Sequence, residues 1–193
     1  VIVLDPGSES HEAEIVYDIA QRIEGRLLAL GASVFLTRGA QNNPSEAERI
    51  SFTNKSSADL LISLHVDHHK NPQARGVATF FYGSDQHGIH SIVGEKFASL
   101  VQREICARTD FINCRSHAKT WDSLRLTKAP AVRVDLGYSS NESDATRLSQ
   151  ADFRNAIAES FVIAIQRLYL AAEDDAKTGT LRISDLRNAG IRR

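Results

Sequence analysis

Apolar residues occur in two patterns along this chain: short continuous runs, and longer stretches in which they recur every three or four positions. The short runs predict buried strands, because a strand covered on both faces needs no polar position. The longer stretches predict amphipathic helices. The expected strands are 1–4, 33–37, 60–65, 77–82 and 131–136, and the expected helices are 12–30, 44–57, 89–109 and 149–170. In the second helix, Glu46, Glu48 and Arg49 are expected to face solvent.

Strands and helices alternate along most of the chain, which predicts an α/β fold. We expect a layered αβα domain with a mostly parallel central sheet of about six strands. This domain covers residues 1–170, a length that buries a sizeable core. Residues 171–193 then form a polar C-terminal tail, acidic first and basic last, which is a candidate regulatory segment.

The composition and the net charge argue against a nucleic-acid partner and against a membrane-spanning segment. The formal net charge is −1, from 23 basic and 24 acidic residues, and no basic patch is interleaved with aromatic residues. We therefore expect no nucleic-acid partner. No apolar run approaches the ~20 residues of a membrane-spanning helix, so no transmembrane segment is expected. The two cysteines are too few for a disulfide framework.

The chain begins inside its first expected strand, which suggests a fragment of a longer protein. An upstream targeting segment therefore stays an open alternative.

Polar side chains gather where the expected strands end, which is where α/β enzymes place their catalytic groups. Taken singly, each is also consistent with a cap or a solvated side chain, above all an acid in the first turn of a helix. Histidine and carboxylates converging from separate strand ends are nevertheless typical of metal hydrolases. The residues are Asp5, Ser8, Glu12, His65, Asp67, His68, His69 and Asp135.

Seven segments in order resemble the zinc-dependent N-acetylmuramoyl-L-alanine amidases of the Amidase_3 family. They are VIVLDPG at 1–7, GASVFLTR at 31–38, ER at 48–49, ADLLISLHVD at 58–67, GVATFFYGS at 76–84, LRLTKAPAVRVDLGYSSN at 124–141 and IAESFVIAIQRL at 157–168. The resemblance implies a zinc ion held by two histidines and a glutamate. A second glutamate acts as general base in cleaving the amide between the lactyl group of muramic acid and L-alanine.

Only part of this machinery carries over to the present chain. The resemblance assigns Glu12 and His65 to two of the metal-ligand positions. Ser8 stands where the family has its first histidine, and His11 is a possible substitute. Asp135 stands at the position of the general base, where the family has glutamate.

These departures predict impaired catalysis. A serine hydroxyl is a poor zinc ligand, and losing a ligand should cost more than the ~10–100-fold in affinity associated with outer-shell changes. Aspartate withdraws the base by one methylene, and a displacement of about 1 Å costs on the order of 10²-fold in rate. Active relatives also have a glycine-rich loop before the glutamate ligand, whereas only residues 9–11 separate Ser8 from Glu12 here. We therefore expect zinc to be weakly bound or absent.

The resemblance is strongest to the CwlM-type regulatory branch of pseudo-amidases. It implies a cytoplasmic regulator of peptidoglycan precursor synthesis, with peptidoglycan-synthesis proteins and a Ser/Thr kinase as partners. Thr178 and Thr180 in the tail are then candidate phosphorylation sites.

Two alternatives stay open. One is an active zinc amidase of the cell wall or periplasm, if a signal lies upstream. The other is a non-catalytic muropeptide-binding module, in which Arg125 and Arg133 pair with substrate carboxylates.

Overall fold

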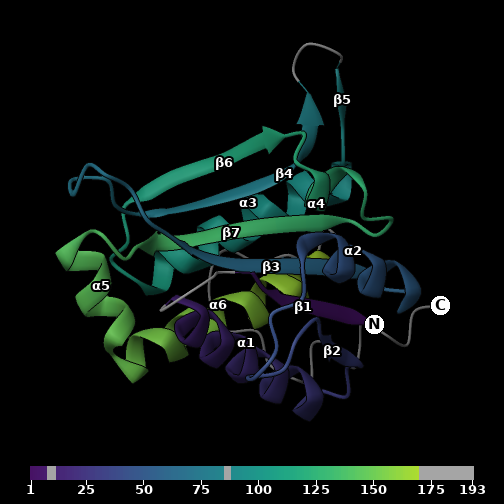
Figure 1. Cartoon of the computed structure of the whole chain (residues 1–193), viewed down its shortest axis with the longest axis horizontal. Helices are drawn as coiled ribbons and strands as arrows, with labels where there is room; N and C mark the ends of the chain where they lie inside the picture. Colours follow the sequence, from purple (N-terminus) through teal and green to yellow (C-terminus); the bar gives the residue numbers. More distant parts are fainter. Residues whose placement is uncertain (8–11, 85–87, 170–193) are drawn as a thin grey trace.

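The computed structural model describes residues 1–7, 12–84 and 88–169, and these ranges fold into helices packed on a central sheet (Figure 1). The strands are β1 (Ile2–Pro6), β2 (Val34–Leu36), β3 (Leu60–Asp67), β4 (Val77–Ser84), β5 (Ile89–His90), β6 (Asn113–Lys119) and β7 (Ala131–Tyr138). The helices are α1 (Glu12–Ala29), α2 (Glu46–Lys55), α3 (Ile92–Arg108), α4 (Asp122–Arg125), α5 (Glu142–Ser149) and α6 (Ala151–Tyr169).

The sheet is mostly parallel, which confirms the predicted fold class. Its strand order is β2-β1-β3-β7-β4-β5, and β6 pairs with β4 beside this path. The pairs β1–β2, β1–β3, β3–β7 and β4–β6 are parallel, whereas β4 runs antiparallel to both β7 and β5. Because β1, β3 and β7 are parallel neighbours, their carboxyl ends meet at one edge of the sheet.

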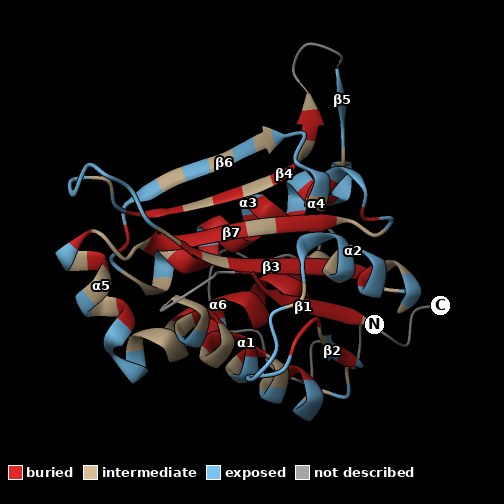
Figure 2. Cartoon of the chain, in the orientation of Figure 1, coloured by how far each residue is buried: buried red, intermediate tan, exposed pale blue. Residues whose placement is uncertain are grey.

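The two faces of the sheet are covered unequally. Helices α1, α3 and α6 pack on one face, where Leu4, Ile62 and Val134 are fully buried in the main core (Figure 2). The shorter α2 and α4 lie over the other face, and a small cluster around Val3 and Leu61 forms there. Successive strand residues point to opposite faces, so the polar residues of the strand ends share the less covered one.

Most boundaries shift by one or two residues from the sequence prediction, and three differences are larger. The helix expected over 89–109 begins at Ile92, because residues 89–90 pair with β4 as β5. The helix expected over 149–170 is preceded by a separate helix, α5, that begins at Glu142 and is capped by Asn141. Strand β6 was not predicted, because its sequence NCRSHAK has no apolar run and its residues alternate between exposed and half-buried.

Strand β6 contains an irregularity in its pairing. The register with β4 shifts between Val77 and Thr79, and Arg115 has a φ of 68°. A non-glycine residue in the left-handed region is uncommon, and here it accompanies one extra residue on β6. The strand is therefore bent at this point.

Between α3 and α6 lies a fully buried ion pair. Arg167 Nε is 3.1 Å from Glu104 Oε1, and neither side chain is exposed to solvent. Arg103 and Arg108 also pair with Glu104 from the edge of this site. Each of these buried charges is compensated by the opposite charge of the other and not by water. The pair therefore links α3 to α6.

None of the helices in the described ranges is long and apolar enough to span a lipid bilayer.

Candidate functional site

The buried carboxylate of Asp5, at the end of β1, anchors the polar residues of this face. Thr37 Oγ1 donates a hydrogen bond of 2.6 Å to Asp5 Oδ1, and Ser63 Oγ donates one of 2.6 Å to Oδ2. Arg49 Nε lies 2.9 Å from Oδ1 and supplies the compensating charge. A buried carboxylate is stable only with such partners. Asp5 thereby ties β1 to β3, to α2 and to the residue that follows β2.

His65, on β3, is oriented by this carboxylate through Ser63. Ser63 Oγ is 2.9 Å from His65 Nε2, and its single proton is already donated to Asp5. His65 must therefore donate from Nε2–H, which leaves the lone pair on Nδ1. Burial, and then the charges of Arg133 and Arg49, hold the pKa of His65 well below its usual value, so the ring is neutral at physiological pH.

Gly7 lies directly against the imidazole of His65. A Cβ atom at this position would be 2.4 Å from His65 Nε2, which is closer than side-chain contacts allow, and 3.2 Å from Ser63 Oγ, which is a tight contact. Glycine is therefore required here by space, because any side chain would displace His65 from Ser63.

Asp135, on β7 beside His65, is held by an arginine of the same strand. Arg133 Nε donates a hydrogen bond of 2.7 Å to Asp135 Oδ1, since residues two apart on a strand share a face. Burial raises the pKa of Asp135, and the adjacent Arg133 opposes that rise while Asp67 adds to it. The carboxylate at the family's general-base position thus already has a cationic partner.

Gly7, His65 and Arg133 border a cleft of about 370 Å³ at the carboxyl end of the sheet, and Asp135 is not among its lining residues. The N-terminus of α2 forms one wall, and Ser45 fixes it through a capping box with Glu48. The lining residues are Gly7, Asn43, Pro44, Ser45, Glu46, Arg49, His65, Val66, Asp67 and Arg133. The cleft therefore joins the strand ends to the start of α2.

The described residues do not fit a complete zinc site. His65 has the orientation of a metal-ligating histidine, whose second nitrogen normally donates to a fixed acceptor. However, the described ranges contain no cluster of three His, Cys, Asp or Glu residues placed to bind a metal. Arg49 and Arg133 also bring positive charge beside His65, which opposes a divalent cation. The expected alternatives Ser8 and His11 lie outside the described residues.

The remaining sequence-predicted site residues are placed as follows. Glu12 is the first residue of α1. Arg133 lines the cleft, whereas Arg125 is on α4, where it binds Asp122 at 2.8 Å and is not among the cleft residues. Thr178 and Thr180 lie outside the described residues.

Sequence reasoning missed the role of Arg49, which was expected to face solvent. Its side chain is 12% exposed and pairs with Asp5. The helical pattern of α2 was too weakly amphipathic to fix which face turns inward, since Thr53 is its only buried residue. The prediction of an outward Arg49 was therefore wrong.

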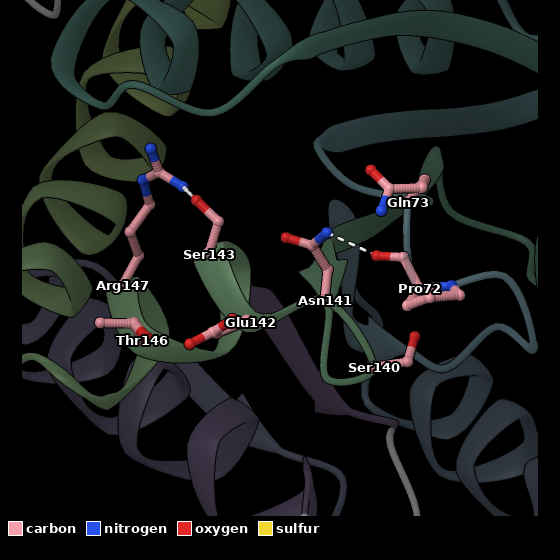
Figure 3. A pocket seen from close by; sticks show the side chains of 8 residues that line it. All are labelled: Pro72, Gln73, Ser140, Asn141, Glu142, Ser143, Thr146 and Arg147. Atoms are coloured by element: carbon pink, nitrogen blue, oxygen red, sulfur yellow. Dashed lines mark hydrogen bonds between the residues drawn. The ribbon is translucent and has the colours of Figure 1, made fainter.

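A second and larger pocket, of about 680 Å³, lies where α5 begins (Figure 3). Asn141 Nδ2 donates a hydrogen bond of 2.7 Å to the carbonyl oxygen of Pro72, which fastens the loop after β3 to the start of α5. Arg147 is bound by Ser143 and by both carboxylate oxygens of Asp110. These polar groups serve the local structure, and the described residues that line this pocket form no catalytic set.

The effect of the Arg133 charge on the pKa of the Asp135 carboxyl should be measurable. Replacing Arg133 with methionine removes the cation that opposes the effect of burial, so the pKa of the Asp135 carboxyl should rise further. A carboxyl ¹³C NMR titration of both proteins checks this. Arg125→Met serves as the control and should leave Asp135 unchanged, since Arg125 pairs with Asp122. An unchanged Asp135 titration in Arg133→Met would contradict the ion pair.

Comparison with known proteins identifies the family of this chain. Residues 4–167 match the Amidase_3 family, described as N-acetylmuramoyl-L-alanine amidase. The chain is 41% identical over 186 residues to N-acetylmuramoyl-L-alanine amidase CwlM of Mycobacterium tuberculosis, which covers 96% of this chain and 46% of CwlM. It is 26% identical to the amidase LytC of Bacillus subtilis, over 77% of this chain and 29% of LytC. The chain thus spans less than half the length of both relatives.

Solved structures agree at the level of the fold. An N-acetylmuramoyl-L-alanine amidase from Clostridium difficile 630 superposes with a TM-score of 0.76 at 22% identity, over 85% of this chain and 93% of that one. The amidase Ami1 from Mycobacterium smegmatis gives 0.75 at 19% identity, over 86% and 95%. The family match over most of the chain and the similarity to CwlM, together with the strand-end site, show that this chain belongs to the Amidase_3 family of N-acetylmuramoyl-L-alanine amidases.

Proposed function

We propose that this chain is a catalytically impaired amidase-fold protein, which regulates peptidoglycan precursor synthesis by binding protein partners. The observation that carries the proposal is the ion pair between Arg133 and Asp135. A general base must be free to take a proton from the attacking water. Here Arg133 Nε donates a hydrogen bond to the carboxylate at that position, which occupies Oδ1 and opposes the rise in pKa that burial causes.

Two further features support impaired catalysis. Aspartate at position 135 is one methylene shorter than the family's glutamate, and a reacting group displaced by about 1 Å costs on the order of 10²-fold in rate. Ser8 stands at the position of the first zinc histidine. In contrast, Asp5, Ser63 and His65 form a hydrogen-bonded chain beside the cleft, which supports a cleft that is ordered for binding.

The regulatory part of the proposal comes from the resemblance to the CwlM-type branch. We place the protein in the cytoplasm, with enzymes of precursor synthesis as partners. A Ser/Thr kinase would modify Thr178 or Thr180, adding about −2 charge and a binding group to the tail.

The catalytic half of the proposal is tested by zinc content and amide cleavage. After dialysis against micromolar zinc and removal of free metal, we expect a zinc content near zero per chain and no release of L-alanine peptides from muropeptides. In the triple variant Ser8→His, Arg133→Leu, Asp135→Glu, the first and third changes introduce the residues that the resemblance assigns to the family, and the second removes a positive charge that acts on His65. We expect this variant to gain zinc. One zinc per chain together with muropeptide cleavage by the unmodified protein would overturn the proposal.

The regulatory half needs a separate assay. Purified precursor-synthesis enzymes from the source organism are assayed with and without this protein, before and after treatment with a Ser/Thr kinase. We expect the rate of at least one enzyme to change, and Thr178→Ala with Thr180→Ala to abolish any dependence on the kinase. Unchanged rates for every enzyme would contradict the regulatory role.

One observation favours an alternative, an active zinc amidase. The orientation of His65 by Ser63 is that of a metal ligand, with Nδ1 carrying the lone pair. The zinc measurement above separates the two functions, because only the alternative requires the unmodified protein to retain a metal.

A further inference from the structure

A second surface with binding chemistry adjoins the cleft on the less covered face of the sheet. Three aromatic rings lie in a row there, contributed by Phe80 on β4, His117 on β6 and Trp121 just before α4. The ring centroids of Phe80 and Trp121 are 4.8 Å apart, and those of Phe80 and His117 are 5.7 Å apart. Trp121 is 37% exposed. We call Phe80, His117, Trp121, Lys119 and Arg133 the aromatic platform.

Two cations are held against the same indole ring. Arg133 Cζ lies 5.0 Å and Lys119 Nζ 5.8 Å from the ring centroid of Trp121. Within the described ranges no carboxylate lies within ion-pair distance of Lys119, and the hydrogen bond from Arg133 to Asp135 uses only its Nε. The guanidinium group has four further N–H donors. The platform therefore presents positive charge beside an exposed aromatic ring.

Anionic groups set the direction in which a ligand would extend. Glu46 and Asp67 line the cleft together with Arg133, so their negative charge disfavours an anionic ligand inside the cleft. In the other direction, Lys119 and the rings of Phe80 and His117 follow β4 and β6. The short helix α4 is a single turn, and in Figure 1 it lies beside β4 and β7 without covering β6.

We propose that the aromatic platform is a binding site for a nucleoside diphosphate, with the base or ribose stacked on Trp121 and the phosphates between Lys119 and Arg133. Stacking on an aromatic side chain tolerates every base, because each has a π-face. The planar fork of arginine pairs with phosphate through two parallel bonds, and lysine adds a point charge. This site goes beyond the proposed function, and it does not depend on whether the protein cleaves amides.

The chain provides its own reporter for this site. Trp121 is the only tryptophan, so the intrinsic tryptophan fluorescence reports on the platform alone. Uridine diphosphate and adenosine diphosphate are titrated in turn, and we expect a saturable change in emission with both. Lys119→Gln should weaken binding by about tenfold, since one charge-assisted contact is lost. Arg125→Gln is the matched control and should bind as the unmodified protein does, because Arg125 pairs with Asp122.

Further ligands separate the contributions of ring and charge. We expect inorganic pyrophosphate and N-acetylmuramic acid each to bind at least about tenfold more weakly than uridine diphosphate, because pyrophosphate lacks the base and N-acetylmuramic acid lacks both the base and the diphosphate. Trp121→Ala, followed by calorimetry, should reduce nucleotide affinity without changing the circular dichroism spectrum. The proposal is overturned if neither nucleotide binds saturably, or if pyrophosphate or N-acetylmuramic acid binds as tightly as the nucleotides.

Discussion

Replacing Glu104 with leucine is expected to destabilise the fold by about 3–5 kcal/mol, because it removes a buried carboxylate that pairs with the fully buried guanidinium of Arg167. Both side chains are fully buried between α3 and α6, and the two charged atoms are 3.1 Å apart. Water cannot replace the lost carboxylate, because the Arg167 side chain is not exposed to solvent, so the penalty falls on the folded state. The free energy of unfolding measured in urea checks the prediction.

The matched variants separate this effect from a general loss of packing. The double variant Glu104→Leu with Arg167→Met removes both charges and should recover much of the lost stability, since buried pairs are often replaceable by apolar groups. Arg103→Ala removes a partner whose side chain is 41% exposed and should cost about 1 kcal/mol or less. A double variant as unstable as Glu104→Leu alone would contradict the argument.

Asp5→Ala should destabilise the protein by a comparable amount, about 3–5 kcal/mol, and release His65 from its fixed tautomer. The substitution leaves the charge of Arg49 uncompensated and removes the acceptor of the Thr37 and Ser63 hydroxyls. Once Ser63 is free to rotate, it no longer requires a proton from His65 Nε2. Urea unfolding gives the stability, and ¹⁵N NMR of the imidazole gives the tautomer.

Asp122→Ala is the control for this substitution, because it also removes an aspartate that pairs with an arginine. The Asp122 side chain is 59% exposed, so its loss should change stability by about 1 kcal/mol or less and leave His65 unchanged. If Asp5→Ala behaved like Asp122→Ala in both measurements, Asp5 would not be the anchor of the site.

The sequence predicted the parts of the fold that bury apolar side chains. Continuous apolar runs identified β1, β3, β4 and β7, because these strands lie inside the sheet and are covered on the core face. Strand β6 escaped detection because it lies at the edge, where pairing with β4 alone does not require apolar residues. Helix α5 has its own cap at Asn141. It was not predicted, because its polar sequence lacks the apolar repeat that identified α6.

The sequence predicted which site residues lie together at the strand ends. It did not predict which side chains pair with one another. His65 and Asp135 were expected together because parallel strands end at one edge, and the pairing of their strands places them side by side. The ion pair between Arg133 and Asp135 follows from their two-residue spacing on one strand, but the sequence alone equally allowed Arg133 to face a substrate. The burial of Arg49 depends on how α2 is rotated, which its polar sequence does not determine.

The bend at Arg115 has a consequence for the behaviour of separate molecules. An exposed edge strand offers unpaired backbone groups to any other strand that approaches it. In β6 the left-handed residue interrupts the regular row of these groups, and Arg115 and Lys119 add positive charge along the same edge. A second molecule therefore finds no straight, uncharged template on which to extend the sheet, and the edge is protected against intermolecular β-pairing.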